Sequence, residues 1–145
     1  MKILKYFYAV VIGFTPMLAA IDTNENIGGC PYMGEESSLA NKTCIPCNRA
    51  VPPLKGEALS ILHKQLGNGW QLIDGHHLEK DYQFKDFAQA LAFTNQIGAV
   101  AEKEGHHPNI HLSWGKVKIL LWTNKIDGLS ESDFILAAKI DKIKP

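Results

Sequence analysis

A carboxylate and two adjacent imidazoles lie close together in the C-terminal half of this 145-residue chain. Glu102 precedes the pair His106 and His107 by four residues, and Pro108 follows the pair directly. Histidine changes charge near neutral pH, so two fixed rings beside a carboxylate can hold one ring neutral as a base and the other protonated as an acid. The cluster therefore predicts acid–base chemistry. The alternative is a surface loop that happens to carry two histidines.

Bulk charge gives no indication of a polyanionic partner. The chain has 15 basic and 15 acidic residues, so its formal net charge at pH 7 is zero. A surface that binds nucleic acid or an anionic membrane carries excess positive charge, and we expect neither as a partner. The hydrophobic fraction of 46% is ample for one packed domain.

The first 21 residues differ in composition from the rest of the chain. Two lysines precede an uncharged run from Tyr6 to Ile21 that ends in small residues, a pattern typical of a secretory signal peptide. The run is too short for a comfortable membrane span, and Pro16 interrupts it. We therefore expect residues 1–21 to be a signal-like segment. The alternative is that translation begins at Met33.

Residues 22–53 are rich in Asn, Gly, Pro and Ser, show no apolar period, and are expected to form a linker. They include Cys44-Ile45-Pro46-Cys47, a spacing found in redox and zinc sites. The βαβ context of a thioredoxin site is missing, and zinc would need two more ligands, such as Cys30 and His63. In an exported protein Cys44 and Cys47 could instead form a small disulfide loop. We expect no metal here.

A helix and a β-hairpin are predicted after the linker. Apolar residues recur at helical spacing from Leu54 to Leu66, and glycines follow them. Residues 70–73 and 77–84 have the composition and alternation of strands, and Asp74-Gly75 between them is a hairpin turn signal.

The clearest predicted element is a helix from Phe87 to Glu104. Asp86 can cap its start, Gln89 can close a capping box, and Gly105 suits its end. The apolar face of this helix is wide enough to leave room for a partner subunit. Glu102 falls at the rim of that face, one turn before the histidines.

Two further strands and a last helix complete the pattern. Residues 110–114 and 117–123 alternate as strands around Gly115, and Ser130 can open a helix with Asp133 at its third position. The element order is then αββαββα. Short strands joined by hairpins favour an α+β architecture, a four-stranded antiparallel sheet with helices packed on one face. This domain is expected to span residues 54–145.

Three segments of this pattern resemble the pterin-4a-carbinolamine dehydratases. They are Phe84-Lys85-Asp86-Phe87, then Ala101-Glu102-Lys103 leading into His106-His107-Pro108, then Gly128-Leu129-Ser130-Glu131 with Asp133; Trp114 adds an aromatic residue. The resemblance runs from about residue 54 to residue 140. It implies the family's fold, a four-stranded antiparallel sheet on helices, and its dimers or tetramers.

The reaction implied by the resemblance is the loss of water from 4a-hydroxytetrahydropterin. An acid protonates the departing hydroxyl, a base takes a proton from a ring nitrogen, and quinonoid dihydropterin results. Neither a metal nor another cofactor is needed. By position, His106 and His107 would be the acid–base pair, Glu102 would orient or charge-balance them, and Pro108 would fix the chain beside the substrate.

Three more positions are expected near the substrate. The family usually places a third histidine on the last strand, where this chain has Asn124, which can form hydrogen bonds but cannot shuttle a proton near neutral pH. Trp122 could stack on the pterin or belong to the core. Asp133 could contact the ligand, although capping the last helix is a sufficient reason for it.

The resemblance also implies partners and a compartment. It implies a pterin as substrate, a functional link to an aromatic amino acid hydroxylase, and a cytoplasmic location; residues 1–21 indicate export as the alternative. Some family members bind a transcription factor through their dimer surface. A non-catalytic dimeric interaction module is therefore the alternative function, and Asn124 favours it.

Two other groups of histidines lie on or beside predicted strands. His76 and His77 open a predicted strand and are expected to be solvated. His111 could join His106 and His107 in a three-histidine metal site, but only its strand phase supports this, and we expect no metal there.

Overall fold

The computed structural model describes residues 38–45, 52–67 and 69–144. The signal-like segment 1–21, Met33, Cys30 and Cys47 lie outside these residues. Within the described part of the chain, no helix is long and apolar enough to cross a membrane.

The predicted α+β architecture and element order are confirmed. A helix, α1 (Gly56–Leu66), precedes the hairpin of β1 (Gln71–Ile73) and β2 (His77–Gln83). The long helix α2 (Phe87–Glu104) leads to a second hairpin of β3 (Asn109–Ser113) and β4 (Lys116–Leu121), and α3 (Glu131–Ile140) follows. Short 3-10 turns, η1 (Leu39–Asn41) and η2 (Asn124–Ile126), lie before α1 and before α3.

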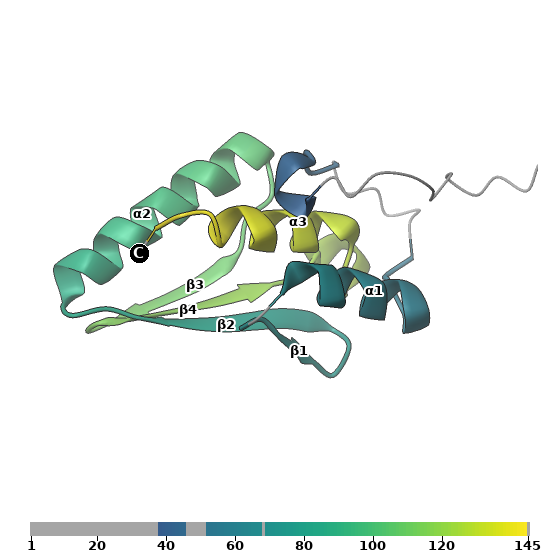
Figure 1. Ribbon diagram of the computed structural model, residues 1–145, viewed down its shortest axis with the longest axis horizontal. Helices are drawn as coiled ribbons and strands as arrows, with labels where there is room; N and C mark the ends of the chain where they lie inside the picture. Colours follow the sequence, from purple (N-terminus) through teal and green to yellow (C-terminus); the bar gives the residue numbers. More distant parts are fainter. Residues whose placement is uncertain (1–37, 46–51, 68, 145) are drawn as a thin grey trace, which may run out of the picture. The chain divides into compact units, whose positions relative to one another are not determined.

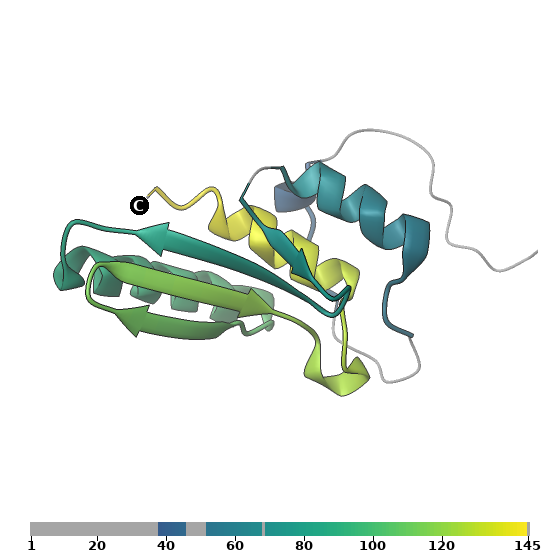
Figure 2. The ribbon, with the colours of Figure 1, turned by 90° about the horizontal axis from the view of Figure 1, so that it is seen from below.

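The four strands form one antiparallel sheet in the order β1-β2-β4-β3. The described helices cover one face of it, and no described helix covers the other (Figures 1 and 2). Strand alternation explains this division, because Val117, Ile119 and Leu121 on β4 are buried while Lys118 and Leu120 between them are only half-buried.

Local sequence determines where α2 begins and ends. The Asp86 carboxylate accepts a hydrogen bond from the Gln89 amide at 2.9 Å, and the Gln89 side chain accepts one from the Lys85 amide at 3.1 Å. In a standard capping box the side chain at the third helical position accepts from the amide of the N-cap residue. Here the Gln89 side chain accepts from Lys85, one residue before the N-cap Asp86. Gly105, at φ 63°, ends the helix in the left-handed conformation that glycine adopts without strain.

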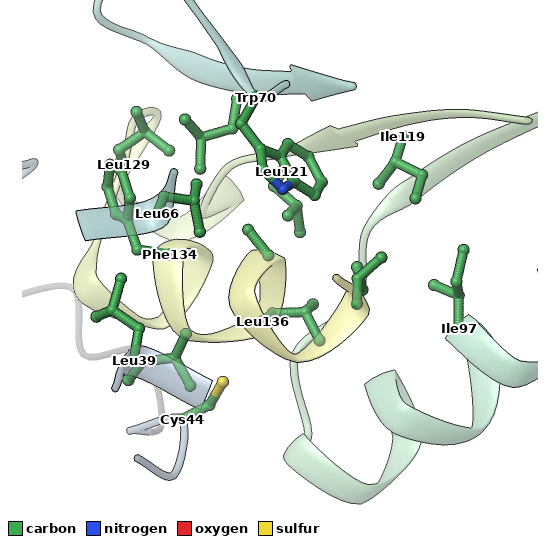
Figure 3. Packing of buried hydrophobic residues seen from close by; sticks show 14 of the residues in the cluster. Leu39, Cys44, Leu66, Trp70, Ile97, Ile119, Leu121, Leu129, Phe134 and Leu136 are labelled. Carbon is green, nitrogen blue, oxygen red and sulfur yellow. The ribbon is translucent and has the colours of Figure 1, made fainter. Parts of the chain in front are cut away.

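Helix α3 lies at the centre of the core (Figure 3). Every side chain from Ser132 to Ala137 is buried, because α1, α2, η1 and the sheet surround the helix. Phe134 and Leu136 on α3 pack with Leu121 of β4 and Ile97 of α2 in one hydrophobic cluster. Burial of each such side chain contributes about 1.5–3 kcal/mol.

Part of the segment expected to be a linker packs on α3. Within residues 38–45, which we call the strap, Leu39 is 4% exposed and Cys44 is 8% exposed, and both belong to the core cluster. The expectation of an unpacked linker is therefore wrong for the strap. Two isolated apolar side chains give no periodic pattern, yet each fills a space beside α3.

One further expectation needs correction. Trp114 was expected on a strand but lies in the turn between β3 and β4, where it is 77% exposed.

The apolar face of α2 is wider than the surface the core covers. Ala90, Phe93, Ile97 and Ala101 are buried, whereas Phe87 and Leu91 are each 41% exposed.

The end of α2 is joined to α3 by an ion pair whose strength depends on pH. The Glu104 carboxylate lies 2.7 Å from Lys139 Nζ, with 5% of the Glu104 side chain exposed. The hydrogen bond from Lys139 lowers the pKa of Glu104. Such a group stabilises the fold above its unfolded pKa, and this stabilisation is lost as pH falls through the lower, folded pKa.

We expect Glu104→Gln to lower the free energy of unfolding at pH 6, and the difference from wild type to shrink as pH falls below the ordinary pKa of glutamate, about 4.3. Urea unfolding at each pH measures this. Glu57→Gln, which removes a carboxylate from an exposed position on α1, is the matched control. A wild-type advantage of equal size at pH 6 and pH 3 would contradict the expectation.

Candidate functional site

The end of α2 turns His106 into the protein. After the left-handed Gly105, the His106 amide donates back to the Ala101 carbonyl at 3.2 Å, which closes the last turn. His106 is consequently 8% exposed. Its ring therefore faces the start of α3, and only a small part of it is exposed to solvent.

His106 is bound by a buried carboxylate. Its Nε2 lies 2.7 Å from Oδ1 of Asp133, which is fully buried. The other oxygen, Oδ2, accepts the Ser130 amide at 2.8 Å and the Thr123 hydroxyl at 2.8 Å. An ionised carboxylate only accepts, so Nε2 carries the hydrogen and the neutral ring keeps its lone pair on Nδ1.

Asp133 thus has two roles. The predicted capping box with Ser130 is present, and the same carboxylate holds His106. Asp133 has no exposed surface and contacts His106, and its direct contact with a ligand stays a prediction.

His107 lies in a different environment from His106. Its side chain is 59% exposed, and its Nε2 is 2.9 Å from Oε1 of Glu102, whose side chain is 78% exposed. A solvated pair of this kind contributes at most about 1 kcal/mol to stability. Glu102, expected to serve both histidines, contacts His107. Adjacent imidazoles in the sequence therefore have two separate carboxylate partners.

Asn124 was expected on the last strand, but β4 ends before it. Thr123 forms an isolated bridge with Gly128, and the chain between them turns as η2, with Asn124 exposed at its start. Because Thr123 is bonded to Asp133, Asn124 follows directly after a residue of the His106 network. Pro108 is half-buried between His107 and β3.

A second aromatic group lies at the same end of the sheet, and the sequence analysis missed it. The rings of His76 and His77 are each centred 6.1 Å from the half-buried Trp122. His76 also lies 3.2 Å from His77, Nδ1 to Nδ1, and 3.2 Å from Asp127, Nε2 to Oδ1. His76 and His77 are thus half-buried, not fully solvated. The informative signal was the Asp74-Gly75 turn, which brings them beside the end of β4.

Strand register relates this group to His107. Leu121 pairs with Leu78, so Trp122 comes next to His77. Leu120 of β4 pairs with Asn109, the first residue of β3, so His107 lies two residues before the strand that borders β4 on its other side. The start of β3, the end of β4 and the β1–β2 turn lie at one end of the sheet (Figure 2).

Comparison with known proteins gives one consistent result. The family model "Pterin 4 alpha carbinolamine dehydratase" matches residues 52–143. The chain belongs to the pterin-4a-carbinolamine dehydratase family.

Named relatives of this dehydratase family are similar over most of their length. A protein of Alkaliphilus metalliredigens, named "Putative pterin-4-alpha-carbinolamine dehydratase", is 57% identical over 73% of this chain and 96% of its own. One of the same name from Rubrobacter xylanophilus is 50% identical over 74% and 99%. A crystal structure of a transcriptional coactivator/pterin dehydratase from Brucella melitensis is 31% identical, with a TM-score of 0.57, over 61% of this chain and 95% of that one.

The dehydratase domain shows no arrangement for a metal in its described residues, where no three His, Cys, Asp or Glu side chains are grouped to hold one. His111 is exposed on β3. Cys44 is a buried free thiol, and burial is the main reason that its pKa is raised to about 12.

We expect Asp133→Asn to lower the free energy of unfolding by about 2–4 kcal/mol, since an amide cannot accept every hydrogen bond that the carboxylate accepts. Denaturant unfolding measures the change. Asp127→Asn is the matched control, because that side chain is 91% exposed and its contact with His76 is solvated. Equal losses for the two variants would contradict a buried anchoring role for Asp133.

Proposed function

We propose that this chain dehydrates 4a-hydroxytetrahydropterin to quinonoid dihydropterin by histidine acid–base catalysis. The observation that carries the proposal is the difference between its two adjacent histidines. His106 is buried against Asp133, and His107 is exposed against Glu102. Family membership supports the substrate class.

His106 is suited to be the base. The Nε2–H bond to Asp133 fixes its tautomer, so the lone pair on Nδ1 accepts the proton from the pterin ring nitrogen, and the buried carboxylate balances the charge that results. Asp133 is thus a positioning residue.

His107 is suited to be the acid. The Glu102 carboxylate, 2.9 Å away, stabilises a positive charge on the ring. The protonated ring gives its proton to the 4a-hydroxyl, the C–O bond breaks, and water departs. The proton taken by His106 and the proton given by His107 balance the step, and exchange with solvent restores both rings.

The dehydration assay tests both roles. Freshly generated 4a-hydroxytetrahydropterin should lose water faster with the wild-type chain than in buffer. His106→Ala and His107→Ala should each lower kcat by about 10²–10⁴, and the double variant should give the buffer rate. His111→Ala, an exposed histidine on β3, should be unchanged. A double variant that keeps the wild-type rate would exclude this mechanism.

Trp122 is proposed to bind the pterin ring by stacking. It lies directly after β4 and beside the His76–His77 pair, and it is half-buried. Offset contact between an indole and a planar heterocycle contributes about 0.5–1.5 kcal/mol beyond area burial. Pro108 and Asn124, which flank the histidines and Trp122 in the chain, are proposed to border the same ligand.

We expect Trp122→Leu to raise KM about threefold to tenfold with kcat nearly unchanged, because stacking holds substrate and transition state alike. Steady-state kinetics of the same assay separates the two constants. Trp114→Leu is the matched control, since Trp114 is 77% exposed at the opposite end of β3. The stacking role fails if both tryptophan variants have the same KM.

The proposed product implies functional partners for this chain. Quinonoid dihydropterin has to be reduced before reuse, which links this chain functionally to a reductase and to an aromatic amino acid hydroxylase.

The exposed Phe87 and Leu91 on α2 support assembly as a homodimer or homotetramer.

A second candidate is a non-catalytic interaction module. The Brucella melitensis structure carries the double name of transcriptional coactivator and pterin dehydratase, and Asn124 stands where the family usually has histidine. The two candidates are separated by Asn124→His. A wild-type chain that is inactive until this substitution is made supports the module, and a wild-type chain at full rate with no gain supports the enzyme.

A further inference from the structure

The strap bonds to both chain segments that meet in the His106–Asp133 contact. The amide of Cys44 donates to Oε2 of Glu104 at 3.1 Å, two residues before His106. The amide of Ile45 donates to the Ser132 hydroxyl at 3.0 Å, one residue before Asp133, and that hydroxyl donates back to the Ile45 carbonyl at 3.1 Å. Adjacent strap residues therefore connect the end of α2 to the start of α3.

The strap is anchored mainly by buried groups. Leu39, Cys44 and Ser132 are 4%, 8% and 4% exposed. The Cys44 thiol donates to the Ser132 carbonyl at 3.5 Å. A buried hydrogen bond of this kind resists competition from water more than the half-buried pair of Lys42 with Glu131, at 2.7 Å, does.

Helix α2 alone does not fix the approach of His106 to Asp133. Gly105, which joins the helix to His106, is exposed and has the backbone freedom of glycine. Glu104 is held from two sides instead, by Lys139 of α3 at 2.7 Å and by the Cys44 amide. Ser132 is held by Ile45 through both of its hydroxyl hydrogen bonds.

We propose that the strap is a positioning element of the active site: it sets the distance and orientation of the His106 ring relative to the Asp133 carboxylate by binding Glu104 and Ser132 with neighbouring residues. A displacement of about 1 Å in a catalytic group can lower a rate a hundredfold. The catalytic consequence rests on the proposed dehydratase function, whereas the effect on the His106–Asp133 contact does not.

The strap lies upstream of the family model, which begins at residue 52. It nevertheless falls within the similarity to the Alkaliphilus metalliredigens protein. A match over 106 residues of a 145-residue chain has to begin at or before residue 40. Most of the strap is therefore part of the domain that this relative shares.

The test compares two variants of the strap contact with one matched variant elsewhere. Ser132→Ala removes the hydroxyl that binds Ile45, and Leu39→Ala removes a buried anchor. Leu59→Ala is the control, because Leu59 is also a buried leucine, 7% exposed, but lies on α1 near Gly75. Thermal unfolding of all three shows how much stability each variant has lost.

The first readout needs no substrate. The ring proton on Nε2 of His106, held by a buried carboxylate, should give a separate NMR signal that exchanges slowly with water in the wild type. We expect this signal to shift or broaden in Ser132→Ala and Leu39→Ala and to persist in Leu59→Ala. The proposal is overturned if Leu59→Ala, at an equal loss of Tm, perturbs the signal as much, or if neither strap variant changes it.

The second readout is kinetic. The strap variants should lower kcat about tenfold and change KM less than twofold, while Leu59→Ala keeps both constants near wild type. Equal kcat in all three variants would overturn the catalytic part of the proposal. An inactive wild-type chain would refute the dehydratase function alone, because the NMR readout still reports whether the strap positions His106.

Discussion

The buried carboxylate of Asp133 is the constraint on which the site depends. It accepts hydrogen bonds from the Ser130 amide at the start of α3, from the Thr123 hydroxyl after the end of β4 and from the ring of His106. One side chain thereby joins the start of α3 to the segment after β4 and to the segment after α2. Because Asp133 is fully buried, loss of the His106 ring would remove the hydrogen bond to Oδ1 in the interior, whereas Oδ2 is shared by several donors. Stability and ring geometry are thus coupled through the same atoms.

Helix α3 gives this carboxylate its surroundings. Its N-terminal turn carries Asp133, and its middle carries Phe134 and Leu136 into the core. Its C-terminal end accepts, through Asp141, the indole N–H of Trp70, the Lys80 ammonium and the Tyr82 hydroxyl. Burial, together with that carboxylate, raises the pKa of Tyr82. Hydrogen bonds therefore join β2 to the C-terminal end of α3 and the segment after β4 to its N-terminal end. The candidate site lies at the N-terminal end, beside His106.

The sequence was informative wherever structure is determined by neighbours along the chain. The Asp86–Gln89 cap, the Gly105 stop and the capping box at Ser130 were all predicted because each involves residues at most four apart. The His106–Asp133 contact spans 27 residues and depends on how α3 packs, so spacing alone could not reveal it. Asn124 was misplaced because the bridge between Thr123 and Gly128 ends the strand early. The strap was missed because Leu39 and Cys44 form no periodic pattern.

The buried sulfur in the strap has a consequence for oxidation chemistry. Peroxides and disulfides react with thiolates, and burial raises the pKa of the Cys44 thiol to about 12, so it is protonated at neutral pH. Cys44 is accordingly a poor nucleophile while it remains packed beside Ser132. Any covalent change at this sulfur would first require the segment to detach, so alkylation of Cys44 by a thiol reagent would report how often that detachment occurs.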